Sequence, residues 1–245
     1  MIRRALIIYC DDTDSGELNG PTHDNTNFRD FLQSNLGGDW YSKEILSLRN
    51  PCSTLVLKAV NEFLAGADYT FTIFTGHGFI NNDDNNRQYI ELANKSIAIS
   101  NLRTTANRQT LIVDSCRGFY SPSREHLKGF SEQFENFIGD PYGTRQMFDR
   151  AVMRADAGWT ILYAASKNQT ALDTSKGAAY LLSLIRTAEN WESVDKKNNI
   201  LSLKITHDFA KKYLDANFDT IQVPIMNGEK RQTHFPFAVK VTALH

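Results

Sequence analysis

Residues 71–78 read Phe-Thr-Ile-Phe-Thr-Gly-His-Gly, and residues 111–118 read Leu-Ile-Val-Asp-Ser-Cys-Arg-Gly. Each stretch is an apolar or β-branched run that stops abruptly at polar and glycine residues, which is typical of a strand buried in a parallel sheet. The carboxyl ends of parallel strands open onto a crevice, so side chains placed there are candidates for chemistry. The two stretches therefore predict both the class of the fold and the place of a site.

More apolar runs of strand length alternate with segments of helical spacing. Strands are predicted at residues 5–9, 41–48, 69–75, 111–113 and 160–164. Helices are predicted at residues 25–35, 53–64, about 177–185 and about 201–213. Asp24 is a candidate N-cap of the first of these helices. The alternation predicts an α/β fold with a mostly parallel sheet that helices cover on both faces.

The length and charge of the chain limit the partners that we expect. The chain has 245 residues and no stretch that resembles a linker, which predicts one domain over residues 1–245. Its formal net charge is -1, and acidic and basic residues are interspersed, so we expect neither a nucleic acid nor an anionic membrane as a partner. We expect no membrane-spanning segment, because no apolar run is long enough to cross a bilayer.

The N-terminal apolar run and the cysteines indicate a compartment. Residues 5–9 are followed by an aspartate pair without a small-residue cleavage site, so the run fits a strand better than a secretion signal. Cys10, Cys52 and Cys116 are widely spaced and form no evident disulfide framework and no metal-binding pair. Free thiols predict a reducing, cytoplasmic location.

His77 and Cys116 follow successive apolar strands and form a candidate catalytic pair. If the strands are neighbours, a strand spacing of roughly 4.8 Å keeps the two side chains within mutual reach. An imidazole can take the proton of a thiol near neutral pH, and the resulting thiolate is the nucleophile. The backbone amides of Gly78 and Cys116 are then candidates to stabilise an oxyanion. Alone, each residue fits a simpler interpretation, a turn histidine or a buried small hydrophobe, but their order along the chain favours catalysis.

These motifs resemble those of the caspase, metacaspase and paracaspase family, whose dyad is a Gly-His-Gly after the third strand and a Cys after the fourth. The matching segments are residues 75–78 and 114–118. The segment around Asp24 resembles the opening segment of the family. Residues 161–166, followed by residues 169–171 and by Gly177, resemble its fifth strand and its substrate-binding loop.

The resemblance implies a caspase-like three-layer sandwich of the α/β class. Its six-stranded sheet would have five parallel strands and an antiparallel last one, with helices on both faces, and residues 237–241 are the candidate for the last strand. The implied activity is that of a cysteine endopeptidase that hydrolyses a peptide bond through a thioester acyl-enzyme. The chain is most similar to bacterial metacaspase-like (orthocaspase-type) members, some of which occur near defence or cell-death systems.

The resemblance also implies a specificity. Metacaspases use aspartates to hold an Arg or Lys of the substrate, and Asp24 and Asp114 match their positions. Ala164 and Ser166 lie in the segment that resembles the substrate-binding loop. We predict cleavage after Arg or Lys, because carboxylates bind a cation through charge-assisted hydrogen bonds. In the simpler interpretation, Asp24 only caps a helix and Asp114 only satisfies a strand end.

Activation and metal dependence stay open at this point. Many metacaspases bind calcium through acidic loop residues, and Asp83 and Asp84 lie in a comparable region, but their short Asn-rich loop favours a solvated turn. A thiol and an imidazole require no cofactor, whereas a need for calcium or for an upstream activator is undecided. Lys128, which Gly129 follows, is the candidate for self-cleavage.

Two functions of other classes compete with the peptidase. One is a catalytically inactive caspase-like module that binds a protein partner, which the complete dyad disfavours. The other is a metal or redox site that uses Cys116 and His77 as ligands. Zinc normally needs four ligands, and His126 is a distant third candidate, so we predict no metal.

Overall fold

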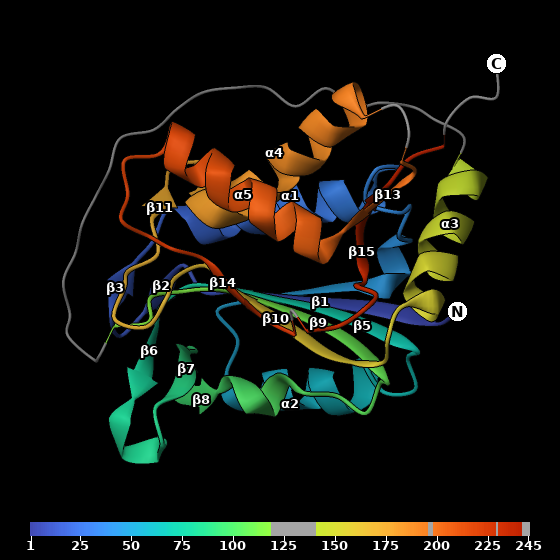
Figure 1. The fold of residues 1–245 in the computed structure, drawn as a ribbon. Helices are drawn as coiled ribbons and strands as arrows, with labels where there is room; N and C mark the ends of the chain where they lie inside the picture. The colour runs from blue at the N-terminus through green and yellow to red at the C-terminus, as the bar shows by residue number, and fades with distance from the viewer. Residues whose placement is uncertain (119–140, 196–197, 229, 242–245) are drawn as a thin grey trace.

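The structure is a computed structural model that describes residues 1–118, 141–195, 198–228 and 230–241. Its centre is a six-stranded sheet in the order β14-β10-β9-β5-β1-β4 (Figure 1). Five of these strands are parallel: β1 (Arg3–Tyr9), β4 (Ile45–Arg49), β5 (Tyr69–Thr75), β9 (Arg108–Asp114) and β10 (Gly158–Tyr163). The edge strand β14 (Ile225–Asn227) runs antiparallel to β10. This arrangement confirms the predicted fold class.

Helices cover both faces of the sheet (Figure 1). One face carries α1 (Gly20–Gln33), α3 (Pro141–Arg154), α4 (Ala179–Val194) and α5 (Leu203–Asn217). The other carries α2 (Ser53–Lys58), which continues as the π-helical turn η2 (Ala59–Phe63). Within the ranges just given, no helix is both long and apolar enough to span a membrane.

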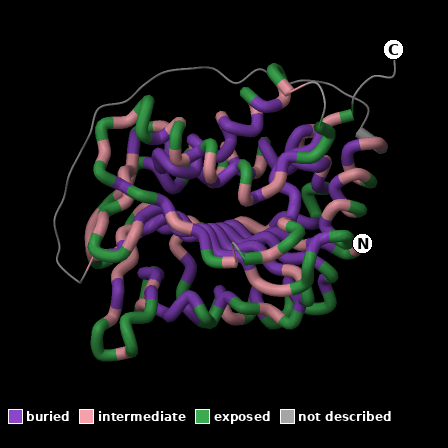
Figure 2. The backbone as a smooth tube through the Cα atoms, in the orientation of Figure 1, coloured by how far each residue is buried: buried purple, intermediate pink, exposed green. Residues whose placement is uncertain are grey.

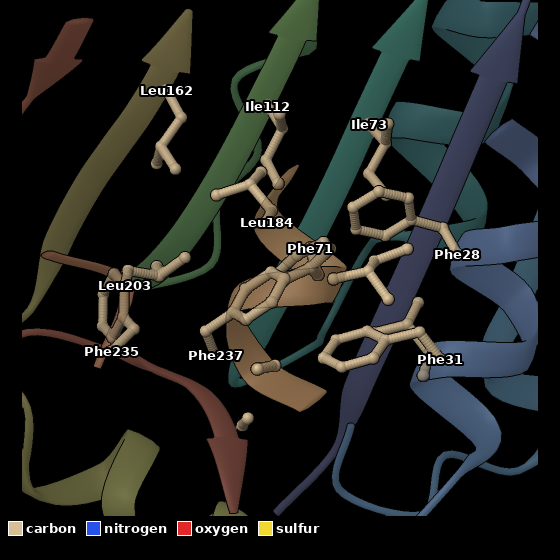
Figure 3. Close-up of a cluster of buried hydrophobic side chains, with 14 of the residues drawn as sticks. Phe28, Phe31, Phe71, Ile73, Ile112, Leu162, Leu184, Leu203, Phe235 and Phe237 are labelled. Atoms are coloured by element: carbon tan, nitrogen blue, oxygen red, sulfur yellow. The ribbon is translucent and has the colours of Figure 1, made fainter. Parts of the chain in front are cut away.

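The core consists of two apolar layers that the sheet separates. Successive side chains of a strand point to opposite faces, so Phe71 and Ile73 of β5 pack with the larger helical layer, whereas Phe74 packs with the α2 layer. Figure 3 shows Phe28 of α1 in the larger layer, close to Ile73. Figure 2 shows that the central strands are buried along most of their length. Burial on both faces explains why these strands appear in the sequence as continuous apolar runs.

Shorter elements surround the sheet, and several of them border the site described below. They are β2 (Asp12–Thr13) and β3 (Gly16–Glu17); η1 (Ser42–Glu44); β6 (Gly78–Asn81), η3 (Asn82–Asp84), β7 (Arg87–Glu91) and β8 (Ser96–Ala98); η4 (Ile99–Leu102); β11 (Asp173–Thr174) and β12 (Gly177–Ala178); and β13 (Ile200–Ser202) with β15 (Pro236–Val239). Strands β6, β7 and β8 form a small antiparallel sheet on the side of α2 (Figure 1). The sequence predicts only a short Asn-rich loop around Asp83 and Asp84, and the structure shows that this loop joins β6 to β7.

The predicted sixth strand, residues 237–241, is wrong. Residues of that segment form β15, which pairs with β13 and not with the central sheet. Phe237 stacks on Phe31 of α1 with ring centroids 4.8 Å apart, so its apolar side chain belongs to the helical layer. The edge of the central sheet is taken by β14, where Ile161 of β10 lies opposite Asn227.

The predicted N-cap, Asp24, is also wrong. Helix α1 begins at Gly20, with Pro21 in its first turn, so Asp24 lies inside the helix and its side chain is buried. Proline fits the first helical turn because the backbone N–H that it lacks would have no partner there. The second strand likewise begins later than predicted, at Ile45, because residues 42–44 form η1.

Candidate active site

His77 and Cys116 leave the sheet side by side. In the parallel pair of β5 and β9, Thr75 lies opposite Asp114, and each candidate residue follows two positions later. The N–H of Gly76 donates to the carbonyl of Asp114 at 3.1 Å, so the ladder continues past the strand ends. His77 and Cys116 are both half-buried, and both line one cavity of about 560 Å³.

The imidazole of His77 has a fixed acceptor on one side. Its Nε2 lies 3.2 Å from the carbonyl oxygen of Gly16, which belongs to the tight β2–β3 hairpin. A carbonyl only accepts, so Nε2 carries a proton and Nδ1 is left to accept one. The φ angle of Gly76, +150°, and the Cys10 carbonyl only 3.0 Å from where a Cβ would stand explain why glycine precedes the histidine.

The turn that carries Cys116 is held by contacts on both sides. The N–H of Arg117 donates to the carbonyl of Gln169 at 2.9 Å, and the guanidinium of Arg117 is buried over the ring of Tyr163. The side-chain amide of Gln88 donates to the carbonyl of Cys116 at 3.1 Å. Burial raises the pKa of the Cys116 thiol, against a hydrogen bond from the backbone of Ala171 that lowers it. The thiol therefore needs a base to become a nucleophile at neutral pH.

Gly78 stands where a larger residue would not fit. A Cβ at this position would lie 2.7 Å from both the Ser115 hydroxyl and the Tyr89 carbonyl, so the residue packs tightly behind the turn of Cys116. The cavity wall includes Cys116 but not Gly78. The proposed oxyanion role of the two amides stays a prediction.

Asp114 and Asp24 lie close together beneath the cavity. Asp114 is part of the wall, and its Oδ2 is buried without a hydrogen-bond partner among the described residues. Asp24 lies behind the wall, where its carboxylate accepts hydrogen bonds from the hydroxyl of Thr75 at 2.6 Å and from the N–H of Ala178 at 2.8 Å. Its contacts are thus those of a buried side chain in mid-helix and not those of a cap.

Burial dominates the ionisation of both carboxyls. It raises the pKa of Asp24 to about 7, even though Thr75 and Ala178 donate to the carboxylate. Burial, together with the negative charges of Asp24 and Asp173, raises the pKa of Asp114 well above its usual range. The three carboxyls therefore disfavour further negative charge in the cavity and favour a cation.

Asp173 is a third carboxyl of the site that the sequence analysis did not single out. It lines the cavity and accepts hydrogen bonds from the backbone N–H groups of Asn19 and Gly20, each at 3.1 Å. Burial raises the pKa of its carboxyl against these bonds. A Cβ on Gly20 would stand 1.8 Å from the Asp173 carboxylate, so any larger residue there would force this side chain to move. The available signal was the place of Asp173 within the segment that resembles a substrate-binding loop.

Ala164 and Ser166, the other predicted substrate-binding residues, do not line the cavity. The carbonyl of Ala164 accepts from the side-chain amide of Gln222 at 2.7 Å, and the hydroxyl of Ser166 donates to the carbonyl of Val223 at 2.9 Å. These bonds anchor the segment whose preceding residues, 219–221, do line the cavity. In this structure the two residues support the wall instead of forming it.

The remaining predicted residues belong to the self-cleavage, zinc and calcium hypotheses. Lys128, the candidate for self-cleavage, and His126 lie outside the described residues. Asp84 accepts hydrogen bonds from the Tyr89 hydroxyl and from Arg87, as expected of a side chain in a polar turn. The described ranges contain no group of three or more His, Cys, Asp or Glu side chains that could hold a metal ion.

Comparisons with known proteins show the family and the fold of the chain. The family model for the caspase domain matches residues 2–235. The chain belongs to the caspase-domain family. Membership in this peptidase family supports a cysteine peptidase, that is, a hydrolase. No curated protein matches the chain.

A solved caspase shares the fold. The crystal structure of caspase-1 from Spodoptera frugiperda superposes with a TM-score of 0.58 at 12% sequence identity, and the match covers 92% of this chain and 85% of that one. At this identity the likeness concerns the fold alone. The caspase fold therefore persists here although few side chains are shared with that enzyme.

Proposed function

We propose that this member of the caspase-domain family is a cysteine endopeptidase in which Cys116 is the nucleophile and His77 the general base, and that it cleaves after Arg or Lys. One observation carries the proposal. His77 and Cys116 each follow, by two residues, a pair of opposite residues at the ends of adjacent strands, and both line a cavity whose wall includes Asp114 and Asp173. Its substrates are proteins or peptides, and the dyad needs no cofactor.

The dyad works by moving one proton. Nδ1 of His77 takes the proton of the Cys116 thiol, and the thiolate attacks the carbonyl carbon of the scissile bond. The imidazolium then returns the proton to the leaving amine, and a thioester remains on the enzyme. Water, deprotonated by the same imidazole, hydrolyses the thioester to release the acid. The Gly16 carbonyl supports this cycle because it holds the ring with Nε2 as the donor at 3.2 Å.

The carboxyls supply the specificity. Asp114 brings a buried oxygen without a partner among the described residues, and Asp173 lies in the same cavity wall. A guanidinium or ammonium group entering the cavity would satisfy that oxygen and offset the mutual repulsion of the carboxylates. Asp24 lies behind the cavity wall, and its negative charge adds to the attraction of the cavity for a cation. This arrangement supports a basic residue before the scissile bond and disfavours an acidic one.

The test is a panel of peptides that differ only in the residue before the scissile bond, Arg, Lys, Asp or Leu, assayed with and without calcium. We expect turnover of the Arg and Lys peptides by the wild type and none by Cys116→Ala. Asp114→Asn should retain a reactive Cys116 but lose at least about tenfold in kcat/KM for the Arg peptide. Preferred cleavage of the Asp or Leu peptide would overturn the specificity, and equal turnover by Cys116→Ala would overturn the dyad.

Several further features belong to the same proposal. They are self-cleavage at Lys128, activation by an upstream partner, a cytoplasmic location, and an origin among bacterial metacaspase-like proteins with a role in defence or cell death. The intact mass of the wild type beside Cys116→Ala tests self-cleavage. A single full-length species in both would remove it.

A catalytically inactive module is the second candidate function, and one observation favours it. Burial raises the pKa of the Cys116 thiol, which keeps the sulfur protonated unless His77 acts on it. A peptidyl chloromethyl ketone that ends in Arg separates the two functions. In an active peptidase this reagent should alkylate Cys116 faster than iodoacetamide does, whereas in an inactive module it should not. Absence of labelling at Cys116 would favour the inactive module.

A further inference from the structure

Strand β7 carries two buried polar side chains, Gln88 and Glu91, that reach the surroundings of both dyad members. The strand belongs to the small β6–β7–β8 sheet and not to the central one. Its main chain is tied to the site as well, because the N–H of Glu91 donates to the carbonyl of His77 at 3.0 Å. Neither side chain lines the cavity. Any role in the reaction would therefore act through other residues.

Gln88 forms hydrogen bonds with the turn that carries the candidate nucleophile. Its amide nitrogen donates to the carbonyl of Cys116 at 3.1 Å and lies 3.2 Å from the hydroxyl of Ser115. Its amide oxygen accepts from Nε of Arg117 at 3.0 Å. The orientation of the amide is fixed, because a carbonyl can only accept and a guanidinium can only donate. One side chain thus contacts three consecutive residues centred on the candidate nucleophile.

Glu91 holds the hairpin that faces His77. Its carboxylate accepts hydrogen bonds from the hydroxyl of Thr13 at 3.1 Å and from that of Ser15 at 2.8 Å. Thr13 is the last residue of β2 and Ser15 lies in the two-residue turn of the β2–β3 hairpin, in which Thr13 pairs with Gly16. The carbonyl of Gly16 is the acceptor for Nε2 of His77. Glu91 therefore fixes the position of that acceptor through two hydroxyl groups.

We propose that Gln88 and Glu91 are positioning residues of the dyad: Gln88 fixes the turn that carries Cys116, and Glu91 fixes the carbonyl that orients the imidazole of His77. The inference rests on the proposed peptidase function. The small β6–β7–β8 sheet then takes part in the reaction, because its strand β7 positions both the sulfur of Cys116 and the imidazole of His77. A displacement of about 1 Å between reacting groups can cost roughly a hundredfold in rate.

The variants separate positioning from stability. Gln88→Met removes every polar contact of the side chain, whereas Gln88→Glu can still accept from Arg117 but cannot donate to the Cys116 carbonyl. Gln109→Met is the matched control. Gln109 is an equally buried amide near the other end of β9, where it bonds Thr104 and the carbonyl of Ala106.

For Gln88 we measure kcat, KM and the melting temperature. Both Gln88 variants should lose about tenfold to a hundredfold in kcat for the Arg peptide, with KM within about twofold of the wild type. The control should lower the melting temperature and leave kcat unchanged. Wild-type kcat in Gln88→Glu would overturn the assignment, because it would show that the bond to the Cys116 carbonyl is dispensable.

For Glu91 we use Glu91→Met, which keeps roughly the size of the side chain but removes both oxygens that accept from Thr13 and Ser15. The proportion of the Nε2–H tautomer of His77, read from the 15N shifts of its imidazole, should fall, and kcat should fall with it. Burial is the largest cause of the raised pKa of the Cys116 thiol, and the negative charge of Glu91 adds to it, so removal of this charge alone should speed alkylation by iodoacetamide. A lower kcat with equal or faster alkylation thus supports positioning. An unchanged tautomer would overturn it.

The outcome also distinguishes this inference from the proposed function. A wild type that hydrolyses no peptide of the panel would end the proposed function. The tautomer of His77 needs no turnover, so it would still decide whether Glu91 orients the ring. Conversely, an active wild type with wild-type kcat in Gln88→Glu and an unchanged tautomer in Glu91→Met would overturn the inference alone.

Discussion

Replacement of Asp24 by asparagine should stabilise the protein at alkaline pH while it weakens cleavage after arginine. Asp24 is 1% exposed, and its two oxygens accept from Thr75 and Ala178. Asparagine keeps the size and can preserve both contacts, since its oxygen can accept from the Ala178 N–H and its NH₂ group can donate to the Thr75 hydroxyl. The substitution therefore removes the titrating charge and little else.

The magnitude follows from the pKa of Asp24, which burial raises from 3.8 to about 7. Below about pH 4 the carboxyl is protonated in both the folded and the unfolded chain. Between about pH 4 and pH 7 the unfolded chain releases the proton and the folded one keeps it, so the free energy of unfolding of the wild type falls as pH rises. At about 1.4 kcal/mol per pKa unit, the loss reaches about 4 kcal/mol above pH 7.

Urea denaturation of the wild type and of Asp24→Asn at pH 4, 6 and 8 measures this effect. The free energy of unfolding of the variant, relative to that of the wild type, should increase by about 4 kcal/mol from pH 4 to pH 8. Asp215→Asn, on the exposed surface of α5, serves as the control and should leave the difference near zero. A difference between wild type and Asp24→Asn that does not change with pH would refute the reasoning.

Three other predictions concern the core, the cavity wall and the free thiols. Phe71→Ala should cost about 3–5 kcal/mol in the free energy of unfolding, because the ring is fully buried, and denaturation curves check it. Gly20→Ala should push the carboxylate of Asp173 off its backbone donors and raise KM for the Arg peptide roughly tenfold, with kcat less affected; an unchanged KM would argue against a role for that carboxyl. In the native protein at pH 8, iodoacetamide should modify the exposed Cys52 and spare Cys10, because burial raises the pKa of the Cys10 thiol to about 12. Peptide mass mapping before and after unfolding measures the modification of each cysteine.

Much of the central sheet could be predicted from local sequence. Strand β5 has the bounds that its run of apolar and β-branched residues indicates, Tyr69–Thr75, because a strand buried on both faces carries few strongly polar side chains. The same property placed His77 and Cys116 at one edge, since both follow runs that stop abruptly. These features could be predicted because each depends on a continuous buried segment, and the residue composition of such a segment indicates that it is buried.

The errors concern features that depend on contacts between distant segments. Strand β14 has three residues, too few for a periodic pattern, and its place at the sheet edge depends on pairing with β10. The stronger apolar run, β15, pairs instead with the short β13. Asp173 acquires its place only when its loop meets the start of α1. Pro21 was the one local signal overlooked, because it marks the first turn of that helix.

The pairing of β5 with β9 has a consequence for how the site tolerates changes in chain length. A longer connection at residues 103–107 would not change the residues that follow the carboxyl ends of β5 and β9. The sulfur of Cys116 and the imidazole of His77 would therefore keep their separation. One residue inserted within β9 itself would reverse the pleat after that point and turn the sulfur toward the opposite layer. The distance between the positions of His77 and Cys116 is thus set by main-chain hydrogen bonds. Substitutions that preserve those bonds can alter the chemistry of the dyad but not this distance.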